Sequence, residues 1–151
     1  MIMQTTTETI EVLNDLIQIN NDRIAGYEKA IRETKPEDDD LKVLFATMIA
    51  ESHRIRIALS TEVQALGADT EQGTTATGRI YRAWMDVKKA LGGNGRHSLL
   101  ASCESIEDST QKAYRSALSH DLPSFIRDLL LQQQEALRTS HDEVKALRTY
   151  A

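Results

Sequence analysis

Four polar side chains interrupt otherwise apolar helical stripes in this chain of 151 residues. They are Asn20, Glu51, Glu107 and Gln133. Burying such groups without partners would cost about 2–7 kcal/mol each, so they must bond to one another, to water or to an ion. The chemistry open to them is either the binding of a divalent cation by the carboxylates or a closed hydrogen-bonded layer between helices.

Helical bundles that hold two metal ions follow a definite ligand pattern. They place a Glu on each of two helices and a Glu-x-x-His pair on each of the other two. The four histidines of this chain, His53, His97, His120 and His141, follow Ala50, Asn94, Ala117 and Arg138 by three positions. The chain therefore has no Glu-x-x-His pair, which disfavours dimetal oxidase chemistry.

Arg54 stands where a ligand histidine would follow Glu51. A guanidinium stays charged at any relevant pH and cannot coordinate a cation. We therefore expect a hydrogen-bonded layer without a cofactor, which fixes the register of the helices. Its predicted members are Asn20, Glu51, Arg54, Glu107 and Gln133, all at one height in the bundle. Asn20 or Asn21 is expected beside Glu51, Glu107 beside Gln133 or Gln134, and Arg54 paired with either glutamate.

Three alternatives to this layer involve other residues. The first is a divalent-metal oxidoreductase that binds iron or another divalent metal without histidine, with Glu28, Glu51, Glu104 and Glu107 as ligands. The second is a redox role for Cys103, although a thiol on the inner stripe of a helix packs as a small hydrophobe. The third is recruitment of a protein partner through a short amphipathic helix that contains Trp84.

The elements that must position these residues are helices, because apolar residues recur every three or four positions. The predicted helices span about 7–33, 38–66, 78–91, 97–119 and 122–149, within one domain over 1–151. Short turns join the first two and the last two long helices, so each pair is antiparallel. The long connection between the pairs carries the short helix 78–91. This order predicts an all-α, antiparallel four-helix bundle with ferritin-like connectivity.

Several segments also resemble a known family. They are Val12–Ile17, Gly26–Ala30, Glu104–Asp108 and Ala113–Tyr114. In these segments the chain is similar to an uncharacterised bacterial family of ferritin-like four-helix bundles of unknown function, and the similarity covers about 7–149. The resemblance implies the same fold and makes Glu107 with Asp108 a family feature, without giving them a role.

Composition narrows the partners. The formal net charge is -5 and the pI is near 5.4, so a phosphate backbone or an anionic membrane would on average repel the chain. We therefore expect neither nucleic-acid nor membrane binding, and a homo-oligomer or a protein partner stays open. One cysteine allows no intrachain disulfide, which favours a cytoplasmic location. Analogy with the family adds the hypothesis of a stress-related binding role.

Overall fold

The chain folds into four long helices, seen here in a computed structural model that describes residues 2–71, 73, 82, 85, 86, 89 and 95–150. They are α1 (Ile2–Glu33), α2 (Asp39–Ala65), α4 (Arg96–Leu118) and α5 (Ser124–Tyr150), with the short 3-10 helix η1 (Pro36–Asp38) before α2. No strand occurs among these residues. The predicted all-α four-helix bundle is therefore confirmed.

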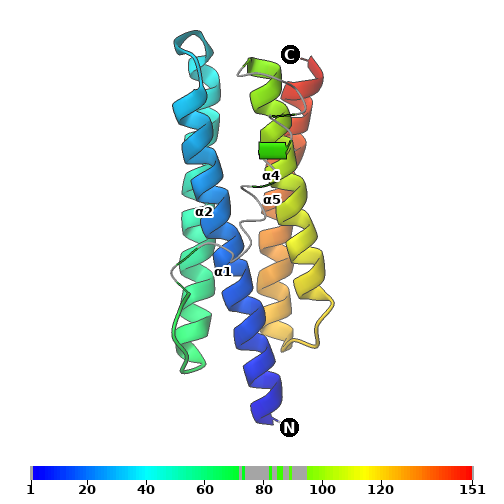
Figure 1. The fold of residues 1–151 in the computed structure, drawn as a ribbon. Helices are drawn as coiled ribbons and strands as arrows, with labels where there is room; N and C mark the ends of the chain where they lie inside the picture. The colour runs from blue at the N-terminus through cyan, green and yellow to red at the C-terminus, as the bar shows by residue number, and fades with distance from the viewer. Residues whose placement is uncertain are drawn as a thin grey trace.

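The order of the helices requires a long crossover. α1 and α2 form one antiparallel pair and α4 and α5 form another (Figure 1). α2 ends at one end of the bundle, whereas α4 begins at the opposite end, near η1 (Figure 1). The connection between α2 and α4 therefore spans the length of the bundle, as predicted. The expected helix 78–91, with Trp84, lies outside the described residues apart from Arg82, Met85, Asp86 and Lys89, which are helical.

The helix ends differ from the sequence prediction by a few residues. α1 begins at Ile2, five residues before the predicted start, because no Gly or Pro precedes Thr7 to stop the helix. α5 begins at Ser124, because Pro123 lies just before the first helical turn. α2 ends at Ala65, and Gly67 follows in the left-handed region with φ of 82°, a conformation that glycine adopts at no steric cost.

The described part of the crossover is attached to α1. The side-chain amide of Asn14 donates to the carbonyl of Asp69 at 3.3 Å, and its oxygen accepts from the backbone N–H of Glu71 at 3.1 Å. About two turns further along α1, Asn21 donates to the carbonyl of Gly73 at 2.8 Å. These bonds hold the first residues of the crossover against the outside of the α1–α2 pair.

The apolar core consists of two clusters. One contains Tyr27, Leu41, Phe45, Met48, Leu100, Cys103 and Ile106, toward the end of the bundle that holds η1. The other contains Leu13, Leu16, Ile17, Leu59, Val63, Tyr114 and Leu130, toward the α4–α5 turn. None of the described helices has the length and hydropathy needed to span a lipid bilayer. The junction between the two clusters is where the polar residues of the sequence gather.

Candidate functional site

Arg23 is the centre of a buried charge network at this junction. It lies on α1 and is fully buried, with 0% of its surface exposed. Its Nε donates to Oε2 of Glu107 and its Nη2 donates to Oε1 of the same carboxylate, both at 2.8 Å. This two-pronged contact joins α1 to α4 and uses both oxygens of Glu107, which is itself 1% exposed.

The same guanidinium also contacts α2. Its Nη2 lies 3.0 Å from Oε1 of Glu51, and its Nη1 donates to the Ser52 hydroxyl at 2.9 Å. Ser140 of α5 then donates to the same oxygen of Glu51 at 2.8 Å. We call the set Arg23, Glu51, Ser52, Glu107 and Ser140 the central network. It links all four long helices.

Burial and the charge of Glu107 set the protonation of the groups at this site. Burial alone would lower the pKa of Arg23, but Glu107, Tyr27 and Glu51 outweigh it, and the pKa is raised well above its ordinary value. Burial, reinforced by the charge of Glu107, raises the pKa of both the Tyr27 phenol and the Cys103 thiol well above their usual ranges. Arg23 is therefore a permanent cation, while the tyrosine and the thiol beside it stay neutral.

A second polar group lies one turn away along α1. Asn20 donates to the Tyr114 hydroxyl at 3.4 Å, and that hydroxyl donates to Oε1 of Gln133 at 2.9 Å. Asn20 also donates to the carbonyl of Leu16 at 2.9 Å. The remaining polar atoms of this group, Oδ1 of Asn20 and Nε2 of Gln133, are buried without a hydrogen-bond partner, as is the Tyr27 hydroxyl.

The structure corrects the predicted polar layer in its central member. Asn20, Glu107 and Gln133 are buried and Glu51 is half-buried, but Arg54 is exposed, so the expected pairing of Arg54 with either glutamate is wrong. Residues three apart on a helix lie about 60° apart around its axis, which turns Arg54 away from the centre while Glu51 faces inward. The cation between the glutamates comes from α1 instead.

The predicted partners of Asn20 and Gln133 also differ. The sequence predicts Asn20 or Asn21 beside Glu51, and Gln133 or Gln134 beside Glu107, with the polar residues of all four helices at one height. Asn20 and Gln133 instead meet through Tyr114, while the two glutamates meet through Arg23. The polar residues therefore form two neighbouring groups, because a helix that places Asn20 at one level places Arg23 nearly a full turn further on.

Sequence reasoning missed Arg23 because its neighbour Ile24 continues the apolar stripe of α1. Arg23 follows Asn20 by three positions and precedes Tyr27 by four, which is the spacing of a single helix face. That spacing was a usable signal. An arginine on an otherwise apolar face requires carboxylate partners on the neighbouring helices.

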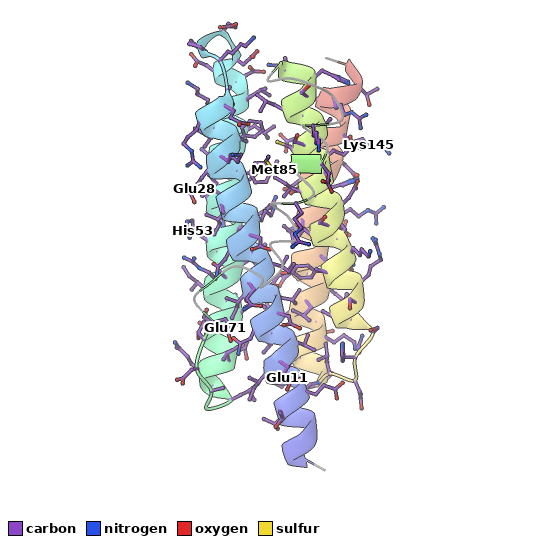
Figure 2. The ribbon with its side chains drawn as sticks, in the orientation of Figure 1. Glu11, Glu28, His53, Glu71, Met85 and Lys145 are labelled. Atoms are coloured by element: carbon purple, nitrogen blue, oxygen red, sulfur yellow. The ribbon has the colours of Figure 1, made fainter. Side chains whose placement is uncertain are left out.

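The alternative metal ligands do not come together. Glu28 is exposed and lies on the outer side of the α1–α2 pair, away from α4 and α5 (Figure 2). Glu104 pairs with Arg148 of α5. Across the described ranges, no three His, Cys, Asp or Glu side chains lie close enough to hold a metal ion. Only Glu51 and Glu107 of the proposed ligands share a site, and the guanidinium lies between them, so the donor set does not fit a dimetal centre.

Comparison with known proteins places the chain in a family. The family model described as "Domain of unknown function (DUF2383)" matches residues 8–120. The chain belongs to this family. The match includes Arg23, Glu51 and Glu107 and ends before α5. The search of curated proteins finds no match.

Among solved structures, this DUF2383 chain is similar to a Dps1 mutant of Mycobacterium smegmatis. The two share 15% sequence identity with a TM-score of 0.82, over 96% of this chain and 97% of the other. At this identity the likeness shows the fold alone, which is a ferritin-like four-helix bundle. The predicted ferritin-like fold and membership of a family of unknown function are thus confirmed.

Proposed function

We propose that this protein is a non-catalytic ferritin-like bundle that acts by association with protein partners and needs no metal. The observation that carries the proposal is the position of Arg23, whose guanidinium lies 2.8 Å from Glu107 and 3.0 Å from Glu51. These two carboxylates lie on the inward faces of α2 and α4, where a dimetal bundle would present its ligands. In this protein the guanidinium of Arg23 pairs with both carboxylates.

Charge makes the replacement effective. A divalent ion between Glu51 and Glu107 would lie within a few ångströms of a guanidinium that cannot lose its proton, and repulsion at that distance is strong in a buried site. The existing hydrogen bonds of the carboxylates also disfavour metal binding. Both oxygens of Glu107 accept from Arg23, and Oε1 of Glu51 accepts from Ser140. The carboxylates would have to give up these bonds to coordinate an ion.

The remaining parts of the proposal come from composition and family analogy. The net charge of -5 supports association with proteins in preference to nucleic acid or an anionic membrane. The single cysteine supports a cytoplasmic location, and a stress-related role in a bacterium follows from the family analogy.

The test is metal analysis of protein purified without chelator, followed by titration with ferrous iron in the presence of oxygen. We expect metal far below one ion per chain and no oxygen consumption beyond that of buffer. Stoichiometric iron that is lost in Glu51→Ala but kept in Glu28→Ala would overturn the proposal. Glu28→Ala is the matched control because Glu28 is exposed on α1 and outside the central network.

A further inference from the structure

The outer stripe of α2 carries unusually little charge. From Val43 to Gln64, the exposed positions of α2 include a single charged side chain, Arg54. Two large apolar side chains on this stripe face solvent, Val43 with 69% and Ile57 with 63% of their surface exposed. Three of the four exposed positions between them, Ala46, Thr47 and Ala50, are small and uncharged, so the two apolar side chains belong to one stripe of low charge, as interaction surfaces do.

The spacing of these residues is symmetric about Ala50. Val43 lies seven residues before Ala50 and Ile57 lies seven after it, so the two are about 21 Å apart on one face. Ala50 is exposed, as are its small neighbours Ala46 and Thr47. If two α2 helices pack antiparallel about a two-fold axis at Ala50, Val43 of each copy meets Ile57 of the other, and the small side chains allow close approach at the axis.

The same axis brings opposite charges together on α1. Arg23 contacts Met48 and Ser52, so it is level with Ala50, and the axis passes α1 near Arg23. Arg32 lies nine residues after Arg23 and Asn14 nine before it, so Arg32 of one copy meets the level of Asn14 in the other.

Asn14 holds the backbone of two acidic residues at that level. They are Asp69 and Glu71, and both are exposed, as is Arg32. Figure 2 shows that Glu28 of α1 and His53 of α2 lie together on the outer side of this pair, away from α4 and α5. A two-fold pairing would therefore form the contact between Arg32 and the acidic segment twice.

We infer that this face of α1 and α2 is the interface of a homodimer, with the occupant a second copy of the chain packed antiparallel about Ala50. α2 has 27 residues, about 40 Å, and two helices side by side are about 20 Å wide. A face of these dimensions, with the first residues of the crossover attached on its α1 side, is large enough for the roughly 800 Å² per partner that a standard stable interface buries. Phe125 and Leu131 on α5 are also exposed, but they lie six residues apart and face different sides of the helix.

The first test is disulfide trapping at the axis. Ala50→Cys places two thiols next to each other across the two-fold axis, at the short Cβ separation that a disulfide needs. Mild oxidation should convert most of this variant to a covalent dimer on a non-reducing gel, while Ala136→Cys, exposed on α5, should stay largely monomeric. The native Cys103 is buried and does not compete. Equal cross-linking of the two variants would overturn the inference.

The second test measures the dimer without a cross-link. In sedimentation equilibrium, Ile57→Glu should weaken the dimer at least about tenfold, because each copy would bury a carboxylate against Val43 of the other. Leu131→Glu is the matched control and should leave the dissociation constant unchanged. Arg32→Glu should weaken the dimer about two- to fivefold, and adding Glu71→Arg should restore it. A wild-type chain that stays monomeric, or a dimer that Ile57→Glu leaves intact, would refute the interface.

This inference rests on the proposed function, since it names the partner in the association. The two fail separately. A metal-free protein that sediments as a monomer refutes the interface alone, whereas a dimer that carries stoichiometric iron refutes the metal-free function alone.

Discussion

One guanidinium, that of Arg23, pairs with two carboxylates. Its removal would therefore leave both negative charges without a cation. A buried ion pair adds little to stability relative to apolar residues of the same volume, because desolvation of the charges offsets their attraction. Removal of one partner is different, since the charge left behind stays buried and unpaired. The central network therefore fixes the register of the four helices. Any packing in which Arg23 does not contact Glu107 would leave buried charges unpaired and would be higher in free energy.

Arg23→Met should destabilise the protein by about 3–5 kcal/mol, because it leaves Glu107 and Glu51 without their cation. Urea unfolding followed by circular dichroism measures the change. Arg115→Met is the control, because Arg115 is exposed on α4, and it should shift the free energy of unfolding by less than about 0.5 kcal/mol. The double variant Arg23→Met with Glu107→Gln should recover part of the loss, since one unpaired carboxylate is removed. A cost for Arg23→Met no larger than that for Arg115→Met would contradict the central role of Arg23.

The spacing of residues along the sequence predicted part of this site. Glu51 and Glu107 stand in apolar stripes, and this marked both as inward-facing. The partner of each glutamate could not be predicted, because pairing between helices depends on how each helix is rotated about its axis. Each residue turns the helix by about 100°, so Arg54, three positions after Glu51, points to solvent. Arg23 was overlooked because Ile24 continues the apolar stripe, yet both side chains are buried. The apolar stripe alone does not show that a charged neighbour is buried beside it, although the spacing from Asn20 to Tyr27 did mark Arg23 as part of one helix face.

His141 provides a pH-dependent contact between α5 and α4. Its Nε2 lies 2.7 Å from Asp108 and its Nδ1 lies 3.3 Å from Asp142. Burial acts to lower the pKa of His141, but the bonds to the two aspartates outweigh it and raise the pKa above its ordinary value of 6.5. The stabilisation is therefore complete below about pH 6.5, the unfolded value, and is lost as the pH rises through the raised folded pKa.

We expect His141→Asn to destabilise the protein by less than about 1 kcal/mol at pH 5.5 and by nearly nothing at pH 9, because the pair is partly solvated. Urea unfolding at the two pH values measures the difference. The same measurement on His97→Asn, an exposed histidine at the start of α4, supplies the baseline. A loss in His141→Asn that is larger at the higher pH would show that the neutral ring makes the contact.

At the scale of elements, an arginine fixes each end of α4. Arg96 acts at its first residue, and Arg127 of α5 acts at its last turn. Arg96, the first residue of α4, contacts Asp38 at 3.1 Å and Asp40 at 2.7 Å, which ties α4 to the beginning of α2 and lowers the pKa of Asp40. At the other end, Arg127 of α5 donates to the carbonyls of Leu118 at 2.9 Å and His120 at 2.6 Å. Positive charge at a helix C-terminus is favourable because the exposed carbonyls are there.

Arg127→Met should cost about 1–2 kcal/mol, because it removes two hydrogen bonds from a charged donor to carbonyls of the α4–α5 turn. Thermal and urea unfolding measure the loss, and amide hydrogen exchange should speed up in the last turn of α4. Arg138→Met is the matched control on the same helix, since Arg138 is exposed and lies 4.0 Å from the exposed carboxylate of Glu135. If the two variants lose the same stability, Arg127 does not cap α4.

Element order was predictable and element ends were less so. The period of apolar residues fixes that a helix exists, whereas its first residue depends on local competition between helix and turn. α1 extends to Ile2 because its early residues contain no stop signal, although Thr5 and Glu8 form the spacing of a capping box. α2 ends at Ala65, two residues before Gly67, whose positive φ of 82° is a conformation that glycine adopts at low cost.

At the scale of the whole molecule, the central network separates two apolar clusters that the same four helices share. Each cluster contains residues from α1, α2, α4 and α5, so neither can unfold without loosening every helix. Arg23 and Glu51 add charged contacts where the clusters meet, and these contacts also bridge all four helices. The bundle is therefore expected to behave as one cooperative unit, in spite of the polar layer at its centre.

Alanine substitutions on either side of the network test this cooperativity. Phe45 and Leu59 are each 0% exposed, one in each cluster, so Phe45→Ala should cost about 3–5 kcal/mol and Leu59→Ala about 2–5 kcal/mol. Both variants should unfold in a single urea transition with the wild-type m-value, and amides of α1 in both halves should lose protection together. The exposed control Phe125→Ala should change little. Two separate transitions in Phe45→Ala would mean instead that the half with Leu59 persists alone, with the central network as a boundary between independent units.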